Sequence, residues 1–236
     1  MAMTLDEIVT QLRSAYGAQL SCIVLYGSAA TDDHVPEKSD YNVLVLLEHI
    51  GTEMVVAASS AARAWRDGGN PPPLTMTVSE WRRSADIFPM EYADILDRHR
   101  VLHGAPPFDG IIISREHLRH QLEQQVMGRL LQLRQGALLA GADGKRQATL
   151  VSLTLSAIMV LFRALVRLTG DTPSGDNVAI VARVAHIAGF DPAPFTHAAE
   201  HHRDNTRIAP AHAATVLAGC LSGLERLDAF LDSSTM

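Results

Sequence analysis

Two strand-like segments near the N-terminus carry the residues with the clearest chemical potential. The segment "LSCIVLY" (20–26) is followed directly by Gly27 and Ser28, and "NVLVLLE" (42–48) begins two residues after Asp40. A glycine lets the backbone approach a bound group closely, and a serine hydroxyl can donate a hydrogen bond to it. Free amides at the start of a following helix or turn favour anions. The pattern therefore predicts a phosphate-binding turn at Gly27 and Ser28.

Asp40 and Asn42 stand at the start of the second strand. Residues two apart on a strand point to the same face, so these two side chains are expected to lie together. Two carboxylates at this spacing would hold Mg²⁺ beside a triphosphate, because Mg²⁺ prefers hard anionic oxygens and takes few of them from protein. Here one of the two is an amide. Lys38 could also reach a phosphate, although a loop lysine is more often simply solvated.

The stretch "YGSAATDDHVPEKSDYNVLVLL" (26–47) resembles the Gly-Ser…Ser-Asp-x-Asp/Glu motif of the DNA polymerase β nucleotidyltransferase superfamily. It looks most similar to the aminoglycoside adenylyltransferases and kanamycin nucleotidyltransferase, which pair this motif with a C-terminal helical bundle. The resemblance covers residues 20–80 by motif and the rest by architecture. It implies a nucleoside triphosphate ligand, Mg²⁺ held by Asp40, and these nucleotide contacts: Gly27, Ser28, Lys38, Asp40 and Asn42.

The chain departs from this pattern at two acids. Asn42 stands where the family keeps a second metal-binding Asp or Glu. "PPPLTMTV" resembles the third strand of the adenylyltransferases, and Thr75 falls where their third carboxylate stands. Metal assistance is worth several kcal/mol, and each ~1.4 kcal/mol lost costs about tenfold in rate. We therefore expect a degenerate active site.

Replacement groups could come from the second half of the chain. In the kanamycin-type enzyme the general base belongs to the helical domain, and Glu123 is the candidate here, although a solvated helix position is the simpler interpretation. Arg163 and Arg167, four residues apart, could contact phosphate or form ordinary interhelical pairs.

The segment "HAAEH" (197–201) matches the His-x-x-Glu-His pattern of inverted zinc proteases. On a helix, His197 and His201 would share a face. That family needs a third ligand well downstream, and Glu225 is the sole glutamate there. We therefore expect the polar end of a helix rather than a protease site.

Composition narrows the function classes. The chain has 236 residues, 47% hydrophobic and 19% charged, which describes a soluble globular protein. A net charge of −6 argues against a general nucleic-acid binder.

Cys22 and Cys220 are too few for a disulfide framework. The uncharged run 147–162 is short for a membrane span, and the N-terminal stretch has no secretory pattern, so a cytoplasmic location is expected.

The predicted fold class is α+β, with a mixed sheet and helices followed by an all-α bundle. The predicted nucleotidyltransferase-like domain spans 1–107, and the helical bundle domain spans 108–236. A helix capped by Thr4 precedes the first strand, and a further helix covers 52–66. Additional strands are expected at 74–78 and 100–104. The bundle helices are expected at 114–140, from the break at "GADGK" (141–145) to Leu168, and at 177–188, 193–203 and 211–231.

Three functions remain open. The chain could bind a nucleotide or phosphate with weak or absent nucleotidyl transfer. It could be an active adenylyltransferase-like enzyme that modifies a small hydroxylated substrate or a protein. It could also be the partner-binding module of a toxin–antitoxin-like pair. The resemblance further allows a homodimer formed through the helical region.

Overall fold

The computed structural model describes residues 3–30 and 40–234. The chain divides into two compact units, Met1–Ser114 and Arg115–Met236, which we call the first unit and the helical unit. The predicted boundary after residue 107 lies earlier than this division. The reason is that Phe108, Ile111 and Ile113 pack against the buried side chains of the sheet and therefore belong to the first unit.

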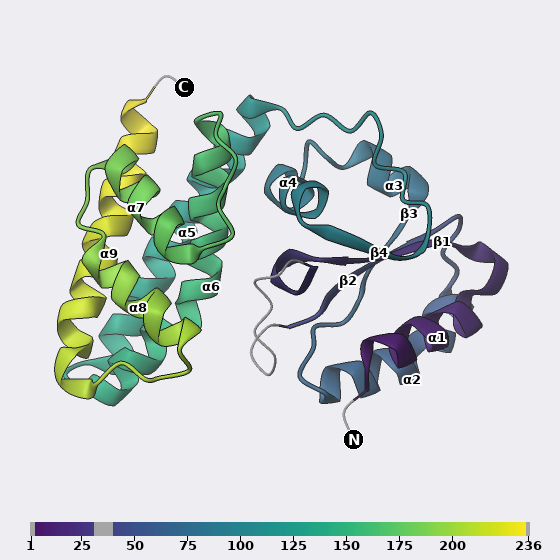
Figure 1. Ribbon diagram of the computed structural model, residues 1–236, viewed down its shortest axis with the longest axis horizontal. Coiled ribbons are helices and arrows are strands. Elements are labelled where there is room, and N and C mark those ends of the chain that lie inside the picture. The colour runs from purple at the N-terminus through teal and green to yellow at the C-terminus, as the bar shows by residue number, and fades with distance from the viewer. Residues whose placement is uncertain (1–2, 31–39, 235–236) are drawn as a thin grey trace. The chain divides into compact units, whose positions relative to one another are not determined.

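The first unit is built on a four-stranded mixed sheet with the order β3-β2-β1-β4 (Figure 1). Strand β1 runs antiparallel to both β2 and β4, whereas β2 and β3 are parallel and are connected by a helix. In chain order the elements are α1 (Leu5–Tyr16), η1 (Gly17–Gln19), β1 (Leu20–Tyr26), η2 (Gly27–Ala30), β2 (Asn42–Leu47), α2 (Thr52–Asp67), β3 (Leu74–Thr77), α3 (Val78–Arg83), α4 (Pro89–Asp97) and β4 (His99–Gly104).

Each face of the sheet is covered by helices. Figure 1 shows α1 and α2 side by side on one side of the sheet, and α3 and α4 on the other. Alternation along the strands sends Val43 and Val45 of β2 into the core with α1 and α2, and sends Leu44 and Leu46 into the core with Trp81 of α3. Both faces are therefore apolar in the middle, and polar side chains are left to the ends of the strands.

The helices α3 and α4 were not predicted from the sequence. The expected strand 74–78 ends at Thr77 because Thr77 and Glu80 form a capping box that starts α3. Pro89 then occupies the first turn of α4, where its missing N–H costs nothing. Tyr92 of α4 stacks on Trp81 and donates a hydrogen bond to the Trp81 carbonyl at 2.7 Å, which fixes the two helices against each other.

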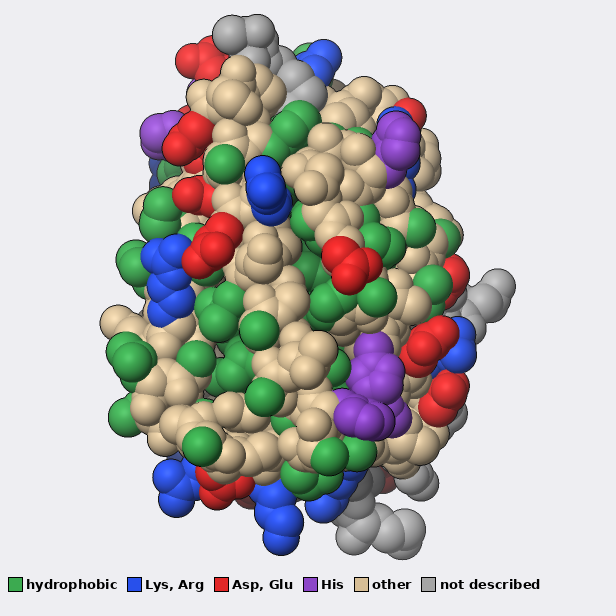
Figure 2. All heavy atoms as spheres, turned by 90° about the vertical axis from the view of Figure 1, so that its left-hand side faces the viewer, with side chains coloured by type: hydrophobic (Ala, Val, Ile, Leu, Met, Phe, Trp, Pro, Cys, Tyr) green, Lys and Arg blue, Asp and Glu red, His purple; other side chains and the backbone are tan. Residues whose placement is uncertain are grey.

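The helical unit contains α5 (Arg115–Ala140), α6 (Gly144–Leu168), α7 (Asn177–Ala188), α8 (Ala193–Arg203) and α9 (Pro210–Ser233). Helix α6 packs against each of the other four. Phe162 of α6 contacts Phe190 and Phe195 at ring-centre distances of 5.9 and 5.1 Å, and this aromatic group ties α8 to the centre of the unit. The face shown in Figure 2 carries acidic and basic side chains interspersed. The α+β fold and the helical C-terminal region agree with the prediction.

Helix α6 also bears on the question of a membrane. By length and composition it is the one helix in the described part of the chain that could cross a membrane. Half of its most apolar stretch is buried within the unit. Cys22 and Cys220 are both buried and free.

The aromatic centre of the helical unit should dominate its stability. Phe162 is fully buried, and Phe162→Ala should lower the free energy of unfolding by about 3–5 kcal/mol because it leaves a cavity. Leu153 on the same helix is 77% exposed, and Leu153→Ala should change stability by less than about 0.5 kcal/mol. Chemical denaturation followed by circular dichroism measures both. Equal losses in the two variants would contradict this packing.

Candidate functional site

One end of the sheet brings the predicted residues together through strand pairing. Tyr26, the last residue of β1, pairs with Asn42 on one side and with His99 on the other. Directly paired residues of neighbouring antiparallel strands point to the same face. Asn42, Tyr26 and His99 therefore form a row on the face that also carries Leu44. This row is the polar end of an otherwise apolar face.

Gly27 places the turn after β1 against Asn42. Its φ is +79°, and a Cβ added at Gly27 would lie 3.5 Å from Asn42 Nδ2. The turn is a single 3₁₀ turn, Gly27–Ala30, and Ser28 is partly buried in it. The Gly27 N–H donates to the Arg98 carbonyl at 3.0 Å, so this amide already serves the fold. The Gly27 amide is therefore not available to a phosphate.

Asp40 is exposed and lies two residues before the start of β2. The Tyr41 N–H donates to Asn70 Oδ1 at 3.0 Å, and this bond anchors the approach to the strand. Asp40 is therefore held close to Asn42 by a fixed backbone, with its carboxylate accessible to solvent. Lys38 falls in 31–39, outside the described residues.

Thr75 requires a correction. It pairs in register with Val45, which belongs to the core with α1 and α2, so its side chain points to the face opposite Asn42. In agreement with this, Thr75 shares a hydrogen bond with Tyr16 of α1. The β3 residues on the Asn42 face are Leu74 and Met76. An acid at position 75 would therefore not point to the Asn42 face. Strand β3 carries no acid on the Asn42 face.

Two acids that sequence reasoning missed lie near this end of the sheet. Burial raises the pKa of the Tyr26 phenol, and the charges of Glu91 and Asp94 raise it further. Both acids belong to α4, three residues apart, and therefore lie on one side of that helix. The spacing in "MEYAD" (90–94) was the available signal, but it could not be used because α4 itself was not predicted.

The candidate residues of the helical unit have local partners. Glu123 accepts a hydrogen bond from Arg119 Nε at 2.7 Å on the same helix. Its carboxylate is therefore part of an ion pair within α5. Arg163 donates to Asn177 Oδ1 at 3.1 Å, which favours interhelical pairing between α6 and α7 over phosphate contact. Arg167 lies in the last turn of α6 and is partly buried.

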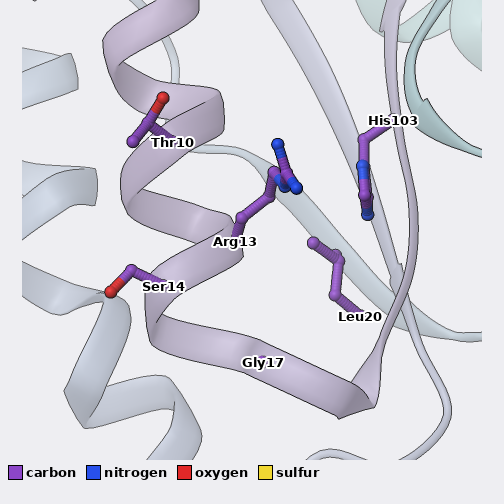
Figure 3. Close-up of a pocket in the computed structure, with 6 residues that line it drawn as sticks. All are labelled: Thr10, Arg13, Ser14, Gly17, Leu20 and His103. Atoms are coloured by element: carbon purple, nitrogen blue, oxygen red, sulfur yellow. The ribbon is translucent and has the colours of Figure 1, made fainter.

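A separate pocket of about 360 Å³ lies at the opposite end of β1, at the Leu20 end. Figure 3 shows Arg13 of α1 and His103 of β4 extending toward the space between their elements. Because Leu20 pairs with Leu47 and Tyr26 pairs with Asn42, this pocket and the Gly27 turn are separated by the length of the strand. The pocket is therefore not part of the candidate site.

Within the described residues, no three His, Cys, Asp or Glu side chains are arranged to hold a metal ion. At the Asn42 end, Asp40 is the one carboxylate at the start of β2. A two-metal centre needs several carboxylates around one point. The described residues at this end of the sheet therefore do not form a two-metal centre.

Comparison with known proteins identifies the fold. The structure superposes on spectinomycin adenyltransferase AAD(9) from Enterococcus faecialis, crystallised with ATP and spectinomycin, with a TM-score of 0.64 and 12% sequence identity. The match covers 97% of this chain and 98% of that one. The chain has the nucleotidyltransferase fold. No protein-family model matches the sequence, and no curated protein matches it.

The left-handed conformation of Gly27 gives a direct test of the turn. Gly27→Ala should lower the free energy of unfolding by about 1–2 kcal/mol, because a Cβ strains the backbone at this φ. Gly128, in the middle of α5, has open space where an added methyl group would lie, and Gly128→Ala should raise stability by up to about 1 kcal/mol. Thermal unfolding should therefore show a lower melting temperature for Gly27→Ala and an equal or higher one for Gly128→Ala. A neutral Gly27→Ala would show that the turn is not as described.

Proposed function

We propose that the chain binds a nucleoside triphosphate with one Mg²⁺ at the Gly27 end of the sheet, and that it transfers nucleotidyl groups weakly or not at all. The observation that carries the proposal is the turn at Gly27, where an added Cβ would lie 3.5 Å from Asn42 Nδ2, with Asp40 two residues before Asn42 in the chain. It combines a close-approach glycine, a serine turn and one carboxylate. The shared fold supports it, because AAD(9) was crystallised with ATP.

The chemistry at this end of the sheet divides into binding and transfer. Binding a triphosphate needs hydrogen-bond donors and one cation to offset the phosphate charge, and Ser28 and Asp40 supply a donor and a ligand for Mg²⁺. Transfer further requires charge stabilisation at both the attacking and the leaving oxygen, which two bridged metal ions provide. The amide of Asn42 carries no charge and bridges two ions poorly. The residues therefore favour binding over transfer.

A second function is favoured by the acids of α4. In an active adenylyltransferase, a substrate hydroxyl oxygen would bond to the α-phosphorus, the bond to pyrophosphate would break, and a carboxylate would take the hydroxyl proton. The charges of Glu91 and Asp94 act on the Tyr26 phenol, and Tyr26 pairs with Asn42, so these two carboxylates are the candidates for that base. A hydroxylated small molecule is the substrate class that this mechanism requires.

Binding is tested by thermal stability. ATP with Mg²⁺ should raise the melting temperature, because a ligand that binds the folded state stabilises it by RT ln(1 + [L]/Kd). Asp40→Ala should remove the Mg²⁺-dependent part of that rise. Asp67→Ala, at the end of α2, is a matched loss of an exposed carboxylate and should leave the rise unchanged. A rise that is the same in all three proteins would place the nucleotide elsewhere.

Transfer is tested by release of pyrophosphate. The wild-type protein should release it from ATP at a rate near background with hydroxylated acceptors, whereas Asn42→Asp should increase the rate about tenfold or more by restoring a metal ligand. Rapid release by the wild-type protein, lost in Glu91→Gln or Asp94→Asn, would instead establish the active enzyme. Thermal shifts with ATP separate a loss of catalysis from a loss of binding.

A further inference from the structure

Three histidines of the helical unit lie together at the junction of α8 and α9. The ring centres of His197 and His201 are 4.5 Å apart, and those of His197 and His212 are 6.5 Å apart. Figure 2 shows histidine side chains gathered in one group on a face of this unit. We call His197, His201 and His212 the histidine cluster. The third member, His212 of α9, joins the two histidines of the segment "HAAEH" (197–201) of α8.

The orientation of His201 suits a metal ligand. Its Nδ1 is hydrogen-bonded to the Thr206 hydroxyl oxygen, and the Thr206 N–H donates to the His201 carbonyl at 3.0 Å. Histidines that bind metals commonly use one ring nitrogen for such a bond, which fixes the tautomer and leaves the other nitrogen for the ion. In His201 that other nitrogen is Nε2.

His197 supplies a second, independent observation. Its Nε2 is buried and has no hydrogen-bond partner. A buried polar atom without a partner is costly, and few are found in folded proteins. A metal ion bound to Nε2 would remove this cost, because a neutral imidazole binds a metal through the lone pair of its unprotonated nitrogen.

We propose that the histidine cluster binds a divalent first-row transition-metal ion such as Zn²⁺ or Cu²⁺, with His197 and His201 as the primary pair and His212 as the third ligand. Residues four apart on a helix share a face, and two imidazoles on one ion hold their ring centres roughly 5 Å apart for Zn–N distances of about 2.0–2.1 Å. The observed 4.5 Å is close to this value.

His212 must move to complete the site. In the described part of the chain no three ligand side chains are already set around one point, and the 6.5 Å between the rings of His197 and His212 is longer than a shared ion requires. His212 is exposed in the first turn of α9, so its side chain can rotate without disturbing the core. The site therefore consists of a nearly formed pair and a third ligand that arrives with the ion.

The test uses the tag-free full chain and Zn²⁺ alone, with Mg²⁺ as the control ion. Calorimetric titration should give one Zn²⁺ per chain and a raised melting temperature, whereas Mg²⁺, which prefers oxygen ligands, should do neither. His197→Asn and His201→Asn should each abolish the effect, and His212→Asn should weaken it. Thr206→Val should weaken it about tenfold by releasing the ring of His201. His120→Asn, on α5 outside the cluster, should bind as the wild type does.

Proton competition gives a further readout that does not depend on substitution. Lowering the pH below about 6 should weaken Zn²⁺ binding, because protons compete for the imidazole nitrogens. Zn²⁺ binding that is unchanged in His197→Asn and His201→Asn, or that is insensitive to acid, would overturn the proposal. Absence of stoichiometric binding by the folded wild-type protein would overturn it as well.

Discussion

The pairing of Tyr26 with Asn42 is the constraint on which the candidate site depends. It sets the end of β1 beside the start of β2, and so it fixes both the Gly27 turn and the approach from Asp40. Because side chains alternate along a strand, a slip of one residue would send Asn42 into the core with α1 and α2 and bring Val43 to the site. The two apolar cores prevent that slip, since each needs its own set of residues from β2. The packing of the sheet thus determines the geometry of the site.

Charge then decides what this geometry can do. The start of β2 carries one carboxylate and one amide, and the register removes Thr75 from the same face altogether. Among the described residues, further negative charge near the site comes from α4, where Glu91 and Asp94 influence the Tyr26 phenol. These acids approach from a helix and not from a neighbouring strand, so they do not reproduce a set of carboxylates around one metal pair. This distribution is the basis of the proposal that the chain binds a nucleotide with little transfer.

Much of the fold was predictable because its signals are local. The capping box at Thr4, the apolar runs of β1 and β2, and the helical periodicity of α5 and α6 each depend on residues close in sequence. The face of Thr75 could not be predicted in this way. Sequence similarity gives the position of a residue along a strand, but the face to which its side chain points depends on the register with the neighbouring strand. The same limit hid His212, which is separated from His201 by a loop and meets His197 only after α8 and α9 pack together. Helices α3 and α4 were missed because they are short and lie among prolines and charged residues, where periodicity is weak.

The number of metal ions bound with a nucleotide tests the central claim most directly. Mn²⁺ can replace Mg²⁺ and can be counted by electron paramagnetic resonance during titration with a non-hydrolysable ATP analogue, in the His197→Asn variant so that the helical unit does not contribute. One carboxylate at the start of β2 predicts one Mn²⁺ per bound nucleotide, with affinity lost in Asp40→Ala. Two tightly bound ions per nucleotide, or no nucleotide-dependent binding at all, would contradict the account.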